Sequence, residues 1–118
     1  GAEAEVHISI GYPVTYNDPS LTARALPVLQ AVAGMENVHE VPARTGAEDF
    51  SFYQKEAPGV FFFLGGMPKG ISPEEAAPHH TPDFYLDESG FILGVKALSN
   101  LAVQYMETHP EGEKSTGK

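Results

Sequence analysis

Hydrophobic and polar residues follow one pattern near the start of the chain and another near its middle. In the stretch EVHISI, the apolar residues Val6, Ile8 and Ile10 alternate with polar ones, which predicts a strand buried on one face only. Residues 60–64, VFFFL, are continuously apolar between a Pro-Gly pair and a Gly-Gly pair, a pattern typical of a strand covered on both faces. The difference predicts that the two strands belong to different sheets.

Three helices are predicted from end signals and from apolar positions at helical spacing. Asp18 is a good N-cap residue and Pro19 suits the first helical position, so a helix is expected from there to Gly34. Pro27 removes a backbone donor in its middle and predicts a kink there or two shorter helices. A short helix is expected from about Asp49 to Glu56. The third begins near Asp87 or Glu88 and ends before Pro110. Its predicted apolar stripe consists of Phe91, Val95, Leu98, Ala102 and Tyr105.

The segment between the apolar run and the last helix, MPKGISPEEAAPHHTPDFYLD, has no periodic pattern and contains four prolines. A loop of this length inside a compact domain is usually functional or disordered. Residues 109–118 have the composition of a solvated tail. The loop is therefore the first place to look for chemistry.

Charge and composition narrow the classes of function. The chain has 118 residues, enough for one domain, and its 16 acidic against 7 basic residues argue against nucleic acid or an anionic membrane as partner. No apolar run approaches the roughly 18 residues of a membrane span. The chain has no cysteine, so a metal would have to be bound by His, Asp or Glu. It starts without Met or a signal peptide, and we expect it to be cut from something longer.

The adjacent histidines His79 and His80 are the first candidate site. Side chains of neighbouring residues in extended chain point in opposite directions, so the pair is not expected to hold one ion together. One of the two rings could be a metal ligand. The alternative is that both are loop histidines that hydrogen-bond to backbone or water. A catalytic zinc site needs about three protein ligands, and no second cluster with ligand spacing is found in the sequence.

The stretch GAEDFS is the second candidate site. Glu48 and Asp49 could act as acid and base, or the helix N-terminus that they precede could bind an anion. The alternative is that Asp49 caps the helix while Glu48 complements its dipole. Ser51 lacks the glycines of a nucleophile elbow, so a serine hydrolase is not favoured.

Several segments taken in order resemble one family of proteins. GYPVTYND, GAEDFSFY, PGVFFFLGG, HHTPDFYLDE and a closing helix are similar, in this order and spacing, to the C-terminal part of the metal-dependent amidohydrolases. That family includes aminoacylases, hippurate hydrolases, other N-acyl-amino-acid amidohydrolases and hydrolases of auxin–amino-acid conjugates. The resemblance extends over residues 1–108.

The resemblance implies an α/β fold. The chain would be the C-terminal portion of a phosphorylase/hydrolase-like catalytic domain, with helices packed on a mostly buried sheet. Residues 1–12 would form the last strand of an inserted α+β lid domain, which is also the expected dimerisation domain. Residues 13–108 would belong to the catalytic domain, and residues 109–118 to the tail.

The resemblance also implies a chemistry. Two divalent metal ions per full-length site (zinc, or manganese, cobalt or nickel) would activate water against the amide bond of a small N-acyl amino acid. The histidine before Thr-Pro, His80, matches a metal ligand of the family, whereas His79 occupies a more variable position and is not assigned as a ligand. Gly46, Ala47, Glu48 and Asp49 match a turn of the substrate cleft. The family's other ligands and its general base have no counterpart in this sequence.

Residues 1–118 are therefore expected to be inactive alone and to act with the remainder of their own polypeptide. A homodimer through the lid domain and a cytoplasmic location are expected, without nucleic-acid or membrane partners. The alternative function is a truncated, non-catalytic relative that serves as a binding or dimerisation module. Metal content and molecular size would discriminate between the two.

Overall fold

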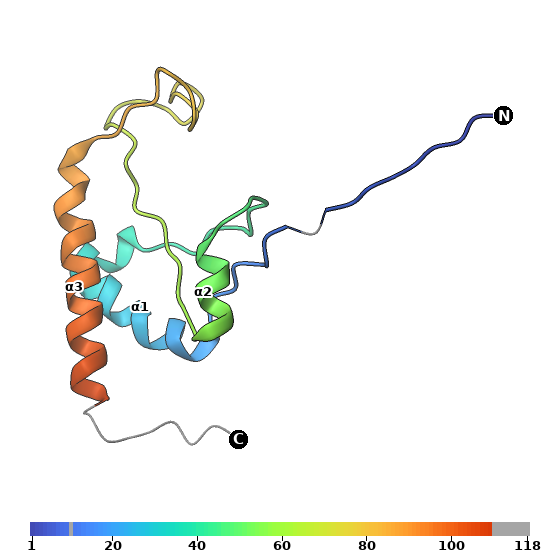
Figure 1. Ribbon diagram of the computed structural model, residues 1–118. Coiled ribbons are helices and arrows are strands. Elements are labelled where there is room, and N and C mark those ends of the chain that lie inside the picture. The colour runs from blue at the N-terminus through green and yellow to red at the C-terminus, as the bar shows by residue number, and fades with distance from the viewer. Residues whose placement is uncertain (10, 110–118) are drawn as a thin grey trace.

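The computed structural model describes residues 1–9 and 11–109, and in this part of the chain all regular structure is helical (Figure 1). The three predicted helices are confirmed, and two short 3-10 turns accompany them. The first helix continues through Pro27 and is not divided into two pieces. The helices are α1 (Pro19–Ala33), α2 (Phe50–Glu56) and α3 (Phe91–Thr108), and the turns are η1 (Met35–Asn37) and η2 (Glu88–Gly90).

The ends of α1 follow the signals in the sequence. The Asp18 carboxylate accepts a hydrogen bond from the Leu21 N–H at 2.7 Å, and Pro19 occupies the first turn, where no backbone donor is needed. Gly34 follows the last residue with a φ of 87°, a backbone conformation that favours glycine, and its N–H donates to the Gln30 carbonyl. Both ends of the helix are thus satisfied by local groups.

Helices α1 and α3 pack against each other, and two alanines lie at the centre of their interface. Ala25 and Ala97 are the buried apolar residues of the described chain, at 8% and 6% exposure. The stripe predicted as the buried face of α3 points elsewhere: Val95 is 59% exposed and Leu98 is 63% exposed. That prediction is wrong for the described structure, because small side chains allow α1 to approach a different face of α3.

The predicted strands are not formed in the described residues. The N-terminal segment is extended and leads away from the helices (Figure 1), with Val6 77% and Ile8 84% exposed; Ile10 lies outside the described residues. Residues 60–64 are also extended without strand assignment. A strand requires a hydrogen-bonded neighbour, and no two extended segments of the described chain pair as strands. The helical part of the expected α/β fold is present, whereas its sheet is not.

The side-chain amide of Asn17 forms hydrogen bonds to the extended segment 60–64 of the kind that a neighbouring strand would form. The Phe61 N–H donates to Asn17 Oδ1 at 2.7 Å, and Asn17 Nδ2 donates to the Phe61 carbonyl at 2.8 Å. Beside it, the Asp18 N–H donates to the Gly59 carbonyl at 3.1 Å. The segment is thereby attached to the residues that precede α1, and Phe61 packs on Phe50 of α2 with ring centroids 5.7 Å apart.

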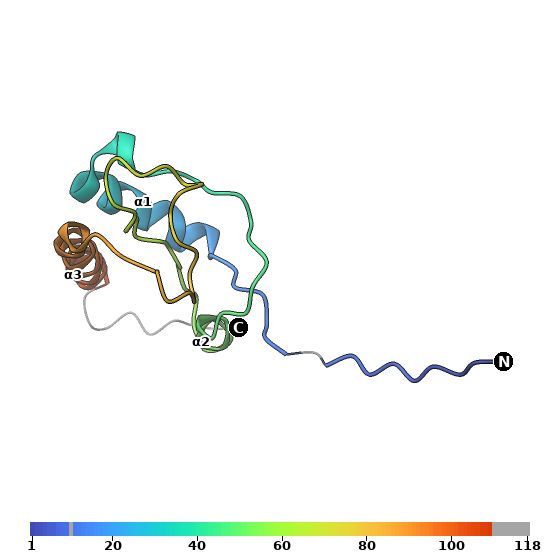
Figure 2. The same cartoon turned by 90° about the horizontal axis from the view of Figure 1, so that it is seen from above.

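The described chain has an open shape, as the view from above also shows (Figure 2). Its radius of gyration is 19.0 Å, against roughly 13 Å for a compact chain of this length. Large apolar side chains such as Phe63 and Met106 remain more than half exposed. None of the helices within residues 1–9 and 11–109 combines the length and apolar character needed to cross a lipid bilayer.

Candidate functional site

His80 lies in the long loop that connects residues 60–64 with α3, at one end of the molecule (Figure 1). Its backbone φ is 64°, and it is the one non-glycine residue with positive φ in the described chain. Histidine adopts this left-handed conformation more readily than most residues, yet such backbone still costs on the order of 1–2 kcal/mol. Outliers of this kind concentrate at functional sites. The side chain of His80 is exposed.

His79 differs from its neighbour in what it contacts. Its ring packs on Phe84 with centroids 4.7 Å apart, and it makes an angle of 66° with the His80 ring. The loop around the pair is held by the Thr81 hydroxyl, which donates to the Pro78 carbonyl at 2.7 Å, and by the Phe84 N–H, which donates to the Thr81 carbonyl at 3.1 Å. Both histidines are exposed, and they differ in that the His79 ring rests on Phe84 while His80 has the left-handed backbone.

In the GAEDF turn, Glu48 and not Asp49 provides the cap of α2. Glu48 Oε1 accepts from the Phe50 N–H at 3.1 Å, and its carbonyl accepts from the Ser51 N–H at 3.2 Å and the Ser51 hydroxyl at 2.6 Å. Asp49 is already in helical conformation, and its side chain makes no cap hydrogen bond. The interpretation of Asp49 as the cap is therefore wrong. Asp49 presents an exposed carboxylate instead.

The other members of this turn, Gly46 and Ala47, are exposed and precede the capped helix. The first N–H groups of α2 are engaged by Glu48, and the helix has only 7 residues, so an anion site at its N-terminus gains no support. Ser51 is 1% exposed with its hydroxyl bonded to backbone, as expected of a structural serine and not of a nucleophile.

The described residues do not bring the two candidate segments into one metal site. No group of three His, Asp or Glu side chains within residues 1–9 and 11–109 is placed to hold a metal ion. As for the chemistry of the donors present, His80 offers an exposed imidazole, which suits zinc and its first-row neighbours. It fits the role of a single ligand.

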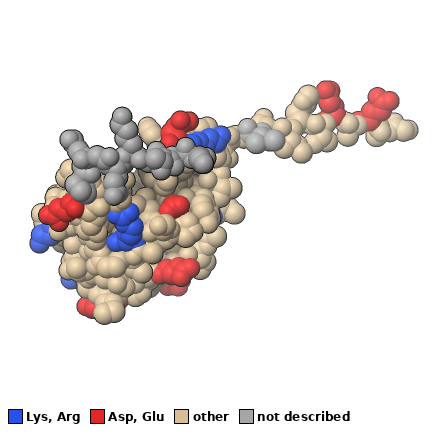
Figure 3. Space-filling model, turned by 90° about the horizontal axis from the view of Figure 1, so that it is seen from below, with Lys and Arg blue, Asp and Glu red and all other residues tan. Residues whose placement is uncertain are grey.

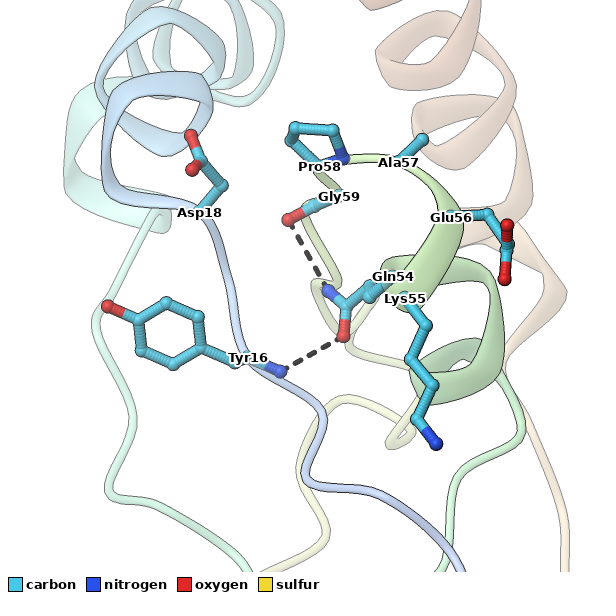
Figure 4. Close-up of a pocket in the computed structure, with 8 residues that line it drawn as sticks. All are labelled: Tyr16, Asp18, Gln54, Lys55, Glu56, Ala57, Pro58 and Gly59. Carbon is cyan, nitrogen blue, oxygen red and sulfur yellow. Dashed lines mark hydrogen bonds between the residues drawn. The ribbon is translucent and has the colours of Figure 1, made fainter. Parts of the chain in front are cut away.

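Gln54 is a bridging residue that sequence analysis did not single out. Its Oε1 accepts from the Tyr16 N–H at 3.0 Å and its Nε2 donates to the Gly59 carbonyl at 3.3 Å (Figure 4). A cavity of about 280 Å³ lies beside this bridge. Because glutamine on a short helix is ordinarily solvated, no sequence signal distinguishes this one. The bridge joins α2 to the segments before α1 and after α2.

His109, which the sequence places at the end of α3, holds that end against α1. With its proton on Nδ1, the ring donates to the Tyr105 carbonyl at 3.0 Å, and Nε2 accepts from Arg24 Nη1 at 2.8 Å. The ring also stacks on Tyr105 with centroids 4.3 Å apart. These contacts give His109 a structural role at the end of α3.

Figure 3 shows acidic and basic side chains scattered over one face of the molecule, most of which is uncharged.

Comparison with known proteins identifies relatives over most of the chain. Residues 2–104 match the model of peptidase family M20/M25/M40. The putative amidohydrolase YhaA of Bacillus subtilis is 31% identical over 105 residues, covering 89% of this chain and 26% of that protein. Thermostable carboxypeptidase 2 of Saccharolobus solfataricus is 35% identical over 96 residues, covering 80% of this chain and 23% of that protein.

A plant protein is also similar to this chain. The IAA-amino acid hydrolase ILR1-like 4 of Arabidopsis thaliana is 36% identical over 95 residues, covering 80% of this chain and 21% of that protein. The chain thus spans about a quarter of the length of the curated relatives that it matches. A search of solved structures found no significant match.

The family match extends over nearly all of the residues that the five ordered motifs occupy, and the resemblance drawn from them is confirmed. Peptidases of this family generally depend on divalent metal ions, in agreement with the kind of cofactor expected. The chain belongs to peptidase family M20/M25/M40.

Proposed function

We propose that residues 1–118 form the C-terminal region of a metal-dependent hydrolase that cleaves the amide bond of N-acyl amino acids or similar small conjugates. The family match supports a hydrolase, and the relatives' names join amide cleavage to amino-acid products: amidohydrolase, carboxypeptidase and IAA-amino acid hydrolase. In this proposal, residues 1–12 are the last strand of the lid domain and residues 13–108 belong to the catalytic domain.

The observation that carries the proposal is the conformation of His80. Its imidazole is exposed and its backbone has a positive φ, which His79 lacks; the His79 ring is also exposed and rests on Phe84. A metal ion, when bound, polarises the amide carbonyl and lowers the pKa of a bound water. His80 would supply one neutral nitrogen ligand to that ion, and the other ligands and the general base would come from the rest of the polypeptide.

The GAEDF turn has a supporting part in this proposal. Gly46, Ala47, Glu48 and Asp49 line the substrate cleft, and Glu48 fixes the shape of the turn through its hydrogen bond from the Phe50 N–H. Asp49, with an exposed carboxylate, is the member of the turn that is available to a substrate group. The identity of the metal, the homodimer through the lid domain and the cytoplasmic location stay predictions.

The test is to replace each histidine of the pair separately in the full-length protein. His80→Ala should reduce the bound metal and lower kcat/KM by at least two orders of magnitude, since one ligand of an open site is lost. His79→Ala is the matched control and should retain metal. The readouts are metal content after dialysis and hydrolysis of a panel of N-acyl amino acids and dipeptides. Equal loss in both variants would contradict the assignment of His80.

A non-catalytic binding module is the second candidate function. The observation in its favour is the exposed apolar stripe on α3, which includes Val95 and Leu98. This candidate predicts that the full-length protein associates with a partner or with itself and hydrolyses no member of the substrate panel. Amidase activity that is lost in His80→Ala would exclude it.

A further inference from the structure

We propose that a neck formed by Gly66 and Asp87 positions His80, so that both residues act on metal binding without contacting the metal. The inference rests on the proposed function, in which His80 is a metal ligand. It adds two positioning residues that lie at the base of the loop, each of them well separated from His80 in the sequence.

The neck closes the long loop of residues 67–86 at its two ends. The Asp87 N–H donates to the Gly66 carbonyl at 2.8 Å, so the chain returns to the place where it left. Loops whose ends lie close together are frequently functional. The position of His80 relative to the helices therefore depends on the geometry of this junction.

A second contact shows how closely the two chain segments of the neck approach each other. A Cβ atom added at Gly66 would lie 2.5 Å from Leu86 Cδ2, whereas a Cβ added at the adjacent Gly65 would meet nothing within 4 Å. An alanine at position 66 must therefore displace the end of the side chain of Leu86, the last residue of the loop, while an alanine at position 65 has room. Gly65 thus provides a matched control at the next residue.

The neck is also joined to the start of α3. The Asp87 carboxylate accepts from the Ser89 N–H at 2.9 Å and caps the turn η2, which continues directly into α3. Since α3 packs on α1 through Ala97 and Ala25, the junction connects the loop to the most closely packed part of the described structure. A ligand on a loop is held more precisely when the loop is supported by the rigid elements of the fold.

The first experiment compares Gly66→Ala with Gly65→Ala in the full-length protein. The affinity for Zn²⁺ is measured by competition with a chromogenic chelator, and thermal unfolding is measured on the metal-free protein. Gly66→Ala should lower the affinity about tenfold, as loss of an outer-shell support does, while both variants unfold at similar temperatures. Adding Leu86→Ala to Gly66→Ala removes the displaced side chain and should restore the affinity, with Leu86→Ala alone as reference.

A second pair of variants keeps the inference testable if Gly66→Ala does not fold. Asp87→Ala removes the cap of η2 and should lower Zn²⁺ affinity, whereas Glu88→Ala changes the exposed neighbouring acid and should not. Unchanged affinity in both Gly66→Ala and Asp87→Ala would overturn the inference. His80→Ala, measured alongside, tests the proposed function separately: if it binds Zn²⁺ as the wild type does, His80 is not the ligand, and the neck has no ligand to position.

Discussion

Glu48 and His80 belong to two loops of different construction. The turn before α2 is held from within, because the Glu48 carboxylate and the buried Ser51 hydroxyl are both hydrogen-bonded to backbone of the same turn. The loop that carries His80 is held at its base, by the Asp87 N–H on the Gly66 carbonyl, and leaves the imidazole exposed. A polar side chain that already has a structural partner is less available for chemistry than one without, although the sequence offered both segments as candidate sites.

The largest expected difference between the two loops is in metal binding. His80→Ala should strongly reduce metal retention with little change in the stability of the metal-free protein, because the His80 side chain is exposed. Glu48→Ala should retain metal and lose about 1 kcal/mol of unfolding free energy, the usual effect of removing a helix cap. Metal analysis and denaturant unfolding of both full-length variants provide the comparison. Loss of metal in Glu48→Ala would place that carboxylate among the ligands.

Ser51→Ala tests whether the turn is held by its own hydroxyl. The side chain is buried and donates at 2.6 Å to the Glu48 carbonyl, so its removal should cost about 1 kcal/mol of unfolding free energy. Ser99→Ala, at an exposed position of α3, should cost almost nothing. Denaturant midpoints of the two variants would show the difference. If Ser51→Ala abolished hydrolysis while leaving stability intact, the structural interpretation of Ser51 would be wrong.

Thr81→Val makes the corresponding change in the His80 loop. It removes the hydrogen bond to the Pro78 carbonyl, formed at 2.7 Å, while keeping the shape of the side chain. We expect a loss of stability of about 0.5 kcal/mol, together with a measurable decrease in metal affinity, because the turn next to His80 is loosened. Thr81→Ser keeps the hydroxyl and serves as the control. An effect on stability without any effect on metal affinity would show that this turn does not support the ligand.

The smallest expected effect is the loss of stabilisation by the Asp87 carboxylate at acidic pH. Hydrogen bonds from the Ser89 hydroxyl and backbone N–H lower the pKa of the Asp87 carboxyl below its ordinary value of 3.8. A lowered pKa means that this stabilisation is complete above the ordinary value and is lost as the pH falls through the folded-state pKa. The neck should therefore be unaffected by pH between neutrality and about pH 5.

NMR titration of labelled aspartates would measure the pKa of Asp87 directly. Ser89→Ala removes the hydroxyl but keeps the backbone N–H, so it should raise the pKa of Asp87 only part of the way toward 3.8. An Asp87 pKa at or above 3.8 in the wild type would show that the cap is not formed in solution.

The helices were predictable because their signals are local. Asp18, Pro19 and Gly34 lie next to the turns that they start or end, and the structure places each of them as expected. The strands were not obtained, because pairing depends on segments far apart in sequence or outside it. The buried face of α3 was also missed: both sides of the helix are apolar, and only the approach of α1 to Ala97 decides between them.

The candidate site also has features that the sequence could predict and features that it could not. His80 has a left-handed backbone and His79 contacts Phe84, while both side chains are exposed. The choice of His80 as the metal ligand came from the resemblance and stays a prediction. The sequence left the roles of Glu48 and Asp49 open, since either residue type can cap a helix. The neck was not predicted at all, because a hydrogen bond between Gly66 and Asp87 joins residues on opposite sides of a loop without periodic pattern.

The amide of Asn17 has a consequence for how the chain can grow into a sheet. It occupies both backbone groups of Phe61, which point to one side of the extended segment. In extended backbone, the groups of Val60, Phe62 and Leu64 point to the other side. A side chain satisfies one residue and cannot continue a ladder as a strand does. The segment is thus closed at Phe61 on one flank, and a strand that joins it must align along the opposite flank.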